Sequence, residues 1–174
     1  MGKVTIRPAG PSDIAAITRI YADAVAHGTA SFEIEPPDEA EMARRQRALL
    51  DKRYPYFVAE HEANIAGFAY AGPYRGRPAY DWCVEDSVYI APALHRRGIG
   101  LALLLRLIAE SEALGFRQMI GVIGDTANAA SIAVHERAGF RVIGTFRSIG
   151  FKHGRWLDTV LMQRPLRAGD AAPP

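Results

Sequence analysis

The chain has 174 residues, of which 49% are hydrophobic and 23% are charged, and this composition is ordinary for a globular protein. A formal net charge of +2 gives no reason to expect nucleic-acid or membrane binding, and a single cysteine excludes an intrachain disulfide. No apolar segment is long enough to span a bilayer or to act as a signal sequence, so a cytoplasmic protein is expected. The length fits one domain, predicted over residues 1–166, with a polar tail at 167–174 expected to be disordered.

Hydrophobic periodicity and turn residues divide the chain into alternating helices and strands. In chain order these are a strand (4–8), two helices (14–25 and 38–51), a hairpin (56–59 and 65–70), a strand (80–90), a helix (98–114), a strand (119–123), a helix (129–138) and two strands (141–149 and 156–162), with loops at 72–78 and 150–154. Ser12 is expected to cap the first helix, and Asp38 with Glu41 resembles a capping box for the second. The order β-α-α-β-β-β-α-β-α-β-β predicts a layered α/β domain.

A basic, glycine-containing loop separates the strand at 80–90 from the helix at 98–114. It reads His95-Arg96-Arg97-Gly98-Ile99-Gly100. Glycine lets an anion approach backbone N–H groups, and a helix N-terminus adds unpaired donors and the positive end of the helix dipole. The loop therefore predicts a pyrophosphate site. The alternative is an ordinary turn with solvated arginines, and the segment matches neither a Walker loop nor the three-glycine dinucleotide motif.

Two segments resemble signatures of the GCN5-related N-acetyltransferase (GNAT) superfamily. Residues 95–100 resemble its acetyl-CoA motif, Gln/Arg-x-x-Gly-x-Gly/Ala, with His95 at the Gln/Arg position, and residues 128–140 resemble its Asn-x-x-Ala/Ser…Gly-Phe signature. The resemblance implies the GNAT fold, a mixed central sheet flanked by helices on both faces, with the pantetheine arm of acetyl-CoA lying where two strands splay apart. It implies acetyl-CoA as co-substrate, no metal, and these cofactor-binding residues: Val88, Tyr89, Ile90, Arg96, Arg97, Gly98, Ile99, Gly100, Leu101, Asn128 and Ser131.

Acetyl transfer from sulfur to nitrogen requires a neutral amine, hence a general base, and a proton for the departing thiolate. Strand alternation puts Glu85, Ser87 and Tyr89 on one face, where burial among aromatic residues would raise the pKa of Glu85. His135, on a helix that starts beside the cofactor, could orient acetyl-CoA, relay a proton or donate one. The alternatives are a surface glutamate at a strand end and a partly exposed helix histidine. No nucleophilic intermediate is needed, so direct attack in a ternary complex is expected.

A closer resemblance, over residues 6–166, is to the phosphinothricin acetyltransferases. It is carried by Ala69-Tyr70-Ala71-Gly72-Pro73, Ala79-Tyr80-Asp81-Trp82, the segment 85–89, and Gly150-Phe151-Lys152-His153-Gly154 followed by Trp156. It implies that Glu85 is the catalytic base and that His135 assists. It also implies a homodimer, in which the hairpin with Lys152, His153 and Arg155 approaches the partner subunit's site, and a role in herbicide or antibiotic resistance. The implied acceptor-binding residues are Phe32, Arg75, Arg77, Tyr80, Ser87 and Tyr89.

The implied acceptor is a small amino acid such as phosphinothricin, methionine sulfoximine or methionine sulfone. Arg75 and Arg77 agree with an anionic acceptor, because each guanidinium offers a fork of donors, although both could equally be solvated loop residues. Another small amine or a protein N-terminus is an alternative acceptor. A non-catalytic acyl-CoA sensor is a third possibility, but such a module would need neither Glu85 nor His135. The sequence leaves open the physiological acceptor, the kinetic order and the division of roles between Glu85 and His135.

Overall fold

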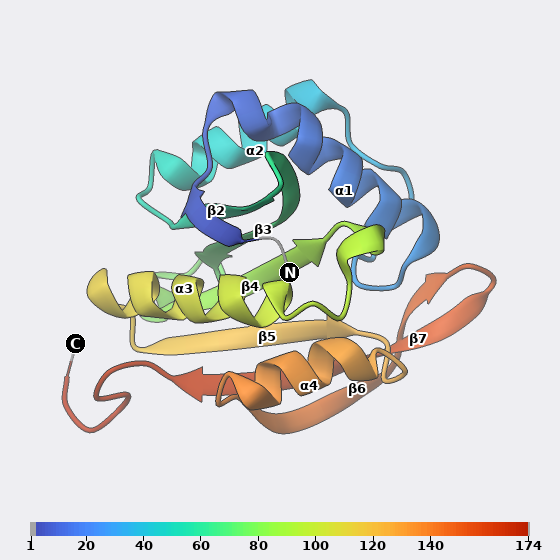
Figure 1. Cartoon of the computed structure of the whole chain (residues 1–174). Coiled ribbons are helices and arrows are strands. Elements are labelled where there is room, and N and C mark those ends of the chain that lie inside the picture. Colours follow the sequence, from blue (N-terminus) through green and yellow to red (C-terminus); the bar gives the residue numbers. More distant parts are fainter. Residues whose placement is uncertain (1–2, 174) are drawn as a thin grey trace.

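A seven-stranded sheet forms the centre of the computed structural model, which describes residues 3–173 (Figure 1). The elements are β1 (Val4–Pro8), α1 (Ile14–His27), α2 (Glu39–Leu50), β2 (Tyr56–His61), β3 (Asn64–Pro73), β4 (Cys83–Ile90), α3 (Ile99–Ala113), β5 (Gln118–Gly124), α4 (Ala129–Arg137), β6 (Arg141–Lys152) and β7 (Arg155–Pro165). The predicted element order and the mixed α/β fold are confirmed. None of the helices in residues 3–173 is both long and apolar enough to cross a membrane.

The strands lie in the order β1-β2-β3-β4-β5-β7-β6, and the pairs from β1 to β4 are antiparallel. Strands β4 and β5 are parallel, because α3 carries the chain back across one face of the sheet between them. Strand β7 then pairs antiparallel with β5, and β6 forms the outer edge. The parallel pair therefore lies in the middle of the sheet, with antiparallel strands on both sides.

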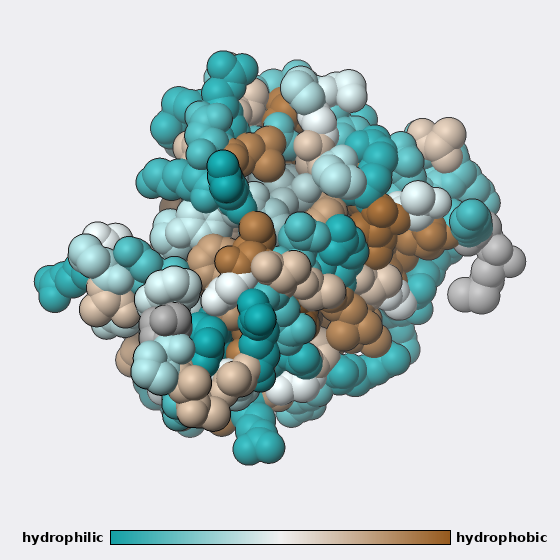
Figure 2. All heavy atoms as spheres, turned by 90° about the vertical axis from the view of Figure 1, so that its left-hand side faces the viewer, coloured by the Kyte–Doolittle hydropathy of each residue, from teal (hydrophilic) through white to brown (hydrophobic). Residues whose placement is uncertain are grey.

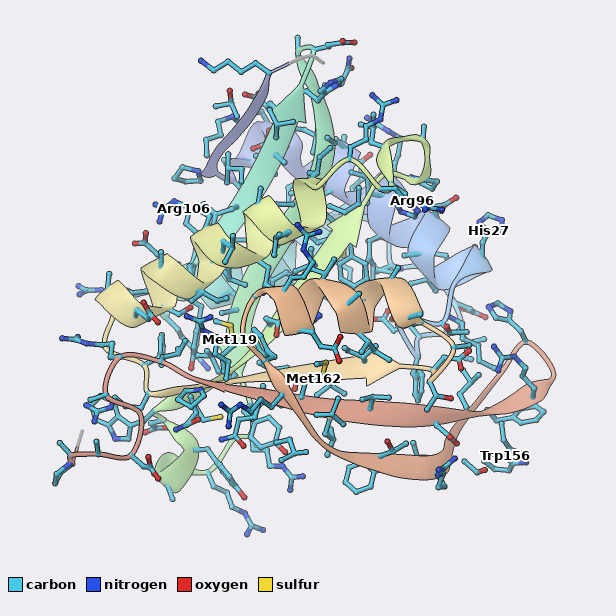
Figure 3. The ribbon with its side chains drawn as sticks, turned by 60° about the horizontal axis from the view of Figure 1, so that its bottom comes forward. His27, Arg96, Arg106, Met119, Trp156 and Met162 are labelled. Atoms are coloured by element: carbon cyan, nitrogen blue, oxygen red, sulfur yellow. The ribbon has the colours of Figure 1, made fainter. Side chains whose placement is uncertain are left out.

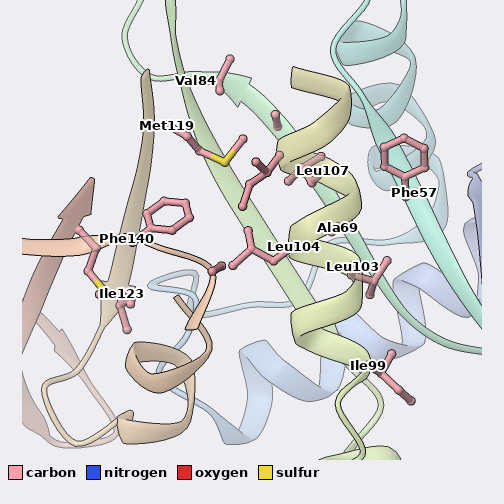
Figure 4. Close-up of a cluster of buried hydrophobic side chains, with 14 of the residues drawn as sticks. Phe57, Ala69, Val84, Ile99, Leu103, Leu104, Leu107, Met119, Ile123 and Phe140 are labelled. Atoms are coloured by element: carbon pink, nitrogen blue, oxygen red, sulfur yellow. The ribbon is translucent and has the colours of Figure 1, made fainter. Parts of the chain in front are cut away.

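Helices α3 and α4 cover one face of the sheet, and α1 and α2 cover the other (Figure 1). Three leucines of α3, Leu103, Leu104 and Leu107, are fully buried and point toward β-strand residues such as Met119 (Figure 4). Their spacing of one, three and four residues keeps them on one side of the helix. On the opposite face, α1 buries Ile17 and Val25 in a second cluster. The site described below lies between these two layers.

One of the two predicted helix caps differs from the structure, and the other is confirmed except for the reciprocal half of its capping box. Ser12 lies within a 3₁₀ turn, Pro11–Asp13, and the residue that precedes α1 is Asp13, whose carboxylate is held by Arg7 at 2.7 and 2.8 Å. The prediction that Ser12 caps α1 is therefore wrong. Asp38 does cap α2, because its Oδ1 accepts from the backbone N–H of Glu41 at 2.8 Å. The reciprocal half of the capping box is missing, since the Glu41 carboxylate binds Arg44 and Arg45 instead.

Several strand limits also differ from the prediction, among them the start of β4 and the end of β6. Tyr80 belongs to a 3₁₀ turn, Pro78–Tyr80, so β4 begins at Cys83 and not at residue 80. The glycine-flanked segment 150–154, expected to be a loop, is mostly strand: β6 runs to Lys152 after an irregular register between Phe146 and Gly150. Only His153 and Gly154 form the turn, and both have positive φ, as a two-residue hairpin turn requires.

The tail beyond β7 folds back toward β5. The guanidinium of Arg117 donates to the backbone carbonyls of Gly169 and Ala172, at 2.8 and 2.7 Å. The β6–β7 hairpin projects from the other end of the sheet (Figure 1). Figure 2 shows the end away from this hairpin, where hydrophilic residues cover most of the surface and hydrophobic residues gather in separate patches.

Candidate functional site

Strands β4 and β5 separate in the middle of the sheet. They pair from Cys83 and Gln118 as far as Asp86 and Gly121, and their remaining residues have no pairing with each other. On its other edge β4 stays paired with β3 as far as Ile90. One edge of the segment 87–90 therefore faces a gap and not a neighbouring strand, as the resemblance to the GNAT fold implies. An extended molecule could pair with this edge as an added strand does.

A cavity of about 340 Å³ opens at this gap. Its walls come from α1, the loop after α1, strands β3, β4, β5 and β7, and the start of α4. The lining residues are Tyr21, Ala30, Ser31, Phe32, Tyr70, Glu85, Asp86, Ser87, Val88, Tyr89, Val122, Ile123, Gly124, Asn128, Ser131, His135 and Thr159. Both predicted catalytic residues thus lie in one cavity, although 50 positions separate Glu85 from His135 in the sequence.

Glu85 is the acidic residue of this cavity that is best suited to accept a proton near neutral pH. Burial, followed by the charge of the neighbouring Asp86, raises its pKa from 4.5 to about 7. A carboxylate in water is a weak base at neutral pH, whereas one with a pKa near 7 can take a proton from an amine and release it again. The local setting of Glu85 therefore suits a general base.

His135 is buried and held through both ring nitrogens. Its Nε2 lies 3.0 Å from Oδ2 of Asp86, and its Nδ1 lies 2.7 Å from the backbone carbonyl of Ser131. Burial alone would lower the pKa of His135, but the hydrogen bond and charge of Asp86 and the Ser131 carbonyl together raise it above its usual value. The predicted alternative, a partly exposed helix histidine, does not describe this side chain, which is 5% exposed.

Gly121 makes room for the contact between Asp86 and His135. A Cβ atom at Gly121 would lie 2.9 Å from Cδ2 of His135 and 3.4 Å from Oδ1 of Asp86. The first distance is shorter than any ordinary carbon contact, so a side chain here would displace the imidazole. The glycine in β5 is therefore part of what positions His135.

The basic loop before α3 has the backbone geometry of an anion site. Arg96 and Gly98 have φ values of 61° and 79°, and Gly98 is the N-cap residue of α3. Positive φ values in such a loop turn successive N–H groups toward one side. Arg96 and Arg97 are exposed, and Arg96 extends from the loop (Figure 3). His95 is tied to β4, since its Nε2 lies 3.0 Å from the carbonyl of Ile90.

The other predicted cofactor residues fall in two places. Val88, Tyr89, Asn128 and Ser131 line the cavity, and the Asn128 side chain caps α4 by accepting from the Ser131 N–H at 3.2 Å. Ile90, Gly100 and Leu101 lie at the end of β4 and in the first turn of α3, and Ile99 is buried in the core. The first group borders the gap, and the second adjoins the basic loop.

The predicted acceptor residues are divided. Phe32, Ser87 and Tyr89 line the cavity. Arg75, Arg77 and Tyr80 do not: they lie on the exposed loop between β3 and β4, where the Arg75 guanidinium stands 5.2 Å from the Tyr74 ring and 5.9 Å from the Tyr80 ring. The cavity lining contains neither lysine nor arginine, so a guanidinium or ammonium group for an acceptor carboxylate has to come from beyond it.

The tip of the β6–β7 hairpin contacts the loop that carries Phe32. The Lys152 ammonium donates to the Ser31 carbonyl at 2.7 Å, and Nε2 of His153 lies 3.1 Å from the Gly28 carbonyl. Arg155 forms an ion pair with Asp125, just after β5. These three residues, expected to approach a partner subunit, thus also hold the chain's own cavity wall in place.

Two features of the site were missed by the sequence reasoning. Strand alternation puts Asp86 on the face of β4 opposite Glu85, and a carboxylate on a buried face indicates that a partner should be sought, but the sequence does not identify that partner. A second feature is the tether of the Phe32 loop, in which the Glu33 carboxylate accepts from the Tyr21 hydroxyl at 2.8 Å and from Arg45 at 2.6 Å. No spacing rule connects these three residues. Among residues 3–173 no cluster of His, Cys, Asp and Glu could hold a metal.

Known proteins resemble this chain closely. The sequence profile of the acetyltransferase (GNAT) family matches residues 12–140. A phosphinothricin N-acetyltransferase from Alcaligenes faecalis is 51% identical over 98% of this chain and 86% of its own length. An L-methionine sulfoximine/L-methionine sulfone acetyltransferase from Salmonella typhimurium is 38% identical over 94% of this chain and 95% of its own. The crystal structure of a phosphinothricin acetyltransferase from Sinorhizobium meliloti in complex with acetyl-CoA superimposes with a TM-score of 0.96, at 48% identity, over 98% of this chain and 92% of that one.

Proposed function

The chain belongs to the GNAT acetyltransferase family, and from that premise we propose that it transfers acetyl from acetyl-CoA to the amino group of a small amino-acid-like acceptor. Phosphinothricin, methionine sulfoximine and methionine sulfone are the proposed acceptors, since the relatives named above carry them in their names. The observation that carries the proposal is the cavity at the β4–β5 gap, where a glutamate with a pKa of about 7 lines the wall. A binding protein without chemistry would have no use for such a group.

Acetyl-CoA, as substrate, supplies the thioester carbon that the amine attacks. In the proposal the edge of β4 at Val88–Ile90 pairs with its pantetheine arm, and N–H groups of the loop 96–101 hold its pyrophosphate, with Arg96 and Arg97 adding charge. Asn128 and Ser131 contact it at the start of α4. The free edge of β4 and the positive φ values before α3 support this arrangement.

Glu85 then takes a proton from the acceptor's ammonium group, directly or through one water. The neutral nitrogen attacks the thioester carbon, the C–N bond forms and the C–S bond breaks. The nitrogen loses a second proton as the amide forms, the departing thiolate takes up a proton, and Glu85 returns its own proton to solvent. Attack within a ternary complex accounts for the chemistry, and no side chain has to carry the acetyl group. His135 lines the same cavity and is proposed to assist Glu85.

Phe32, Ser87 and Tyr89 form the proposed acceptor pocket, with Arg75, Arg77 and Tyr80 on the adjoining loop. Because the cavity lining contains neither lysine nor arginine, Arg75 and Arg77 are the groups proposed to bind an acceptor's carboxylate. The lining holds the carboxyl groups of Glu85 and Asp86 and neither lysine nor arginine, which favours acceptors whose side chain is neutral, such as methionine sulfone, over the phosphinate of phosphinothricin. It equally suits the alternative of another small amine.

The proposal includes a homodimer. Large apolar side chains are exposed on β6 and at the start of β7, where a monomer would leave them in water: Val142, Ile143, Phe146, Ile149, Phe151 and Trp156. Trp156, 63% exposed, points away from the sheet (Figure 3). An apolar edge strand of this kind is normally covered by a partner. We also propose a cytoplasmic enzyme whose residues 1–166 act as one domain, and a part in resistance to toxic amino-acid analogues.

The test is thiol release from acetyl-CoA with a panel of acceptors: phosphinothricin, methionine sulfoximine, methionine sulfone, ordinary amino acids, polyamines and a peptide. Selective turnover of the first three is expected, with methionine sulfone and sulfoximine preferred. Turnover of the peptide or the polyamines alone would replace the acceptor class. Tight binding of acetyl-CoA with no turnover of any acceptor would favour the acyl-CoA sensor.

A further inference from the structure

The contacts of His135 restrict its protonation. Both neighbours of the ring nitrogens, the Asp86 carboxylate and the Ser131 carbonyl, are hydrogen-bond acceptors. A carbonyl oxygen only accepts, so Nδ1 must carry a proton to make its 2.7 Å contact. An ionised carboxylate also only accepts, so Nε2 must carry one as well. The arrangement is satisfied by an imidazolium beside a carboxylate.

The surroundings of Asp86 require the same charge. Its side chain is 2% exposed, and Oδ1 has no hydrogen-bond partner among the described residues, so His135 is the group that compensates the buried carboxylate. Two uncharged residues pack against the imidazole: Phe140, edge-on with 5.0 Å between ring centres, and Gly121 of β5. Glu85 immediately precedes Asp86 in β4 and faces the opposite side of the sheet. The charge of Asp86 raises the pKa of Glu85, so the two carboxyl groups are electrostatically linked across the strand.

We propose that Asp86 is a positioning residue that holds His135 as a doubly protonated, fixed cation in the cavity wall, so that His135 acts by charge and orientation and does not hand over a proton. Releasing the proton on either nitrogen would break a hydrogen bond and, at Nε2, would leave a buried carboxylate without a partner. Glu85 is then the group in the pair that exchanges protons with the reactants. The inference deepens the proposed function and rests on it for its catalytic consequence.

The experiment is an NMR titration of the histidine side chains in the full-length protein. The chain has five histidines, and the His135 signals are assigned by their loss in His135→Gln. In the unmodified protein both ring nitrogens of His135 are expected to be protonated at pH 7, with a titration midpoint above that of an ordinary histidine. In Asp86→Asn the midpoint should fall below the ordinary value, because burial then acts without the opposing carboxylate. This readout needs no turnover, so its failure is distinguishable from failure of the proposed function.

Activity supplies the second readout. Asp86→Asn is expected to lower kcat by roughly 10- to 100-fold, as small misplacements of catalytic groups do, and to leave KM for acetyl-CoA within about threefold. The matched control is Asp170→Asn, which removes an exposed carboxylate of the tail and should change none of these quantities.

A neutral His135 at pH 7 in the unmodified protein, with one bare ring nitrogen, would overturn the proposal. So would a His135 midpoint that is the same in Asp86→Asn and in the unmodified protein. If Asp86→Asn does not fold, Asp86→Ser removes the same charge with a smaller side chain, and the measurement on the unmodified protein stands without any variant.

Discussion

Glu85 and Asp86 are neighbours in β4, point to opposite faces of the sheet, and line the same cavity. Asp86 bonds to His135 on the α3–α4 face, whereas Tyr89, which shares the Glu85 face, packs edge-on against Tyr21 of α1. In an intact sheet, side chains on opposite faces are separated by the backbone layer. They share a cavity here because β4 and β5 part just beyond these two residues.

Replacing Glu85 with glutamine should abolish most turnover without weakening acetyl-CoA binding. The amide keeps the size of the side chain but cannot accept a proton, and loss of a general base costs about 10²- to 10⁴-fold in rate. Thiol release at pH 7.5 and calorimetric titration with acetyl-CoA measure the two quantities. Unchanged turnover would remove Glu85 from the mechanism.

The pH profile of kcat/KM should rise through about pH 7. Glu85 must be ionised to accept a proton, and burial and Asp86 raise its pKa to about 7, so its basic form is gained as the pH increases through that value. The acceptor's own ammonium group titrates at higher pH and adds a second rise. Profiles measured with two acceptors whose amines differ in pKa distinguish the two rises. The rise near pH 7, which belongs to Glu85, should appear at the same pH with both acceptors, whereas the rise at higher pH should move with the amine. Absence of a shared rise would contradict the assignment.

The raised pKa of Glu85 also predicts that Glu85→Gln has a larger free energy of unfolding than the unmodified protein at alkaline pH. Below pH 4.5 the glutamate is protonated in both the folded and the unfolded chain, so it does not lower the free energy of unfolding. Between 4.5 and about 7 the folded chain holds the proton more tightly, so stability falls as the pH rises, and the full cost applies above 7. Urea melts should show Glu85→Gln more stable by roughly 1–2 kcal/mol at pH 8, a figure discounted for partial exposure, and equal near pH 4.5. Glu35→Gln, at an exposed loop position, serves as the control with no such difference.

Gly121→Ala should damage catalysis through His135. Its added methyl group would lie 2.9 Å from the imidazole, so the ring has to move away from Asp86. We expect a loss of roughly 1–3 kcal/mol in unfolding free energy and at least a tenfold loss in kcat. The matched control is Gly144→Ala in β6, where nothing lies within 4 Å of the new atom. Equal losses in both variants would mean that glycine in a strand, and not the contact with His135, is what matters.

Arg75→Ala tests how the acceptor is held. If the guanidinium binds the acceptor's carboxylate, KM for the acceptor should rise by about 10-fold or more, while KM for acetyl-CoA stays the same. Steady-state kinetics with each substrate varied in turn provide both values. Parallel increases in the two constants would instead assign Arg75 to the packing of Tyr74 and Tyr80.

The layout of the fold could be predicted because its segments carry strong local signals. The apolar stripe of α3, ending at a glycine, and the Asp38 cap of α2 are features of a few adjacent residues. The errors lie where a longer-range contact decides the structure. Arg7 binds the Asp13 carboxylate at the start of α1. Gly150 pairs with Leu157 of β7 and so belongs to β6, although the local composition favours a loop.

The candidate site could be predicted only in part, for a similar reason. Glu85, His135 and Asn128 stood out through their motifs, and all three line the cavity. The link between Asp86 and His135 spans 49 positions, and the carboxylate on a buried strand face indicates that a partner is needed without identifying His135 as that partner. The exposed position of Arg75 depends in turn on the path of the loop between β3 and β4, which glycine and proline leave open in the sequence.

The separation of β4 from β5 should also make the stability of this protein depend on the supply of acetyl-CoA, if acetyl-CoA binds along β4 as proposed. The central sheet of the free chain has an edge at 87–90 that only water can satisfy, and a ligand lying along it completes the hydrogen bonding. A ligand present at 100 times its dissociation constant stabilises the folded state by about 2.7 kcal/mol. Without that ligand, the unfolded state is more populated, and proteases that cleave unfolded chains should degrade the protein faster. The abundance of the enzyme would then follow the level of the molecule it consumes.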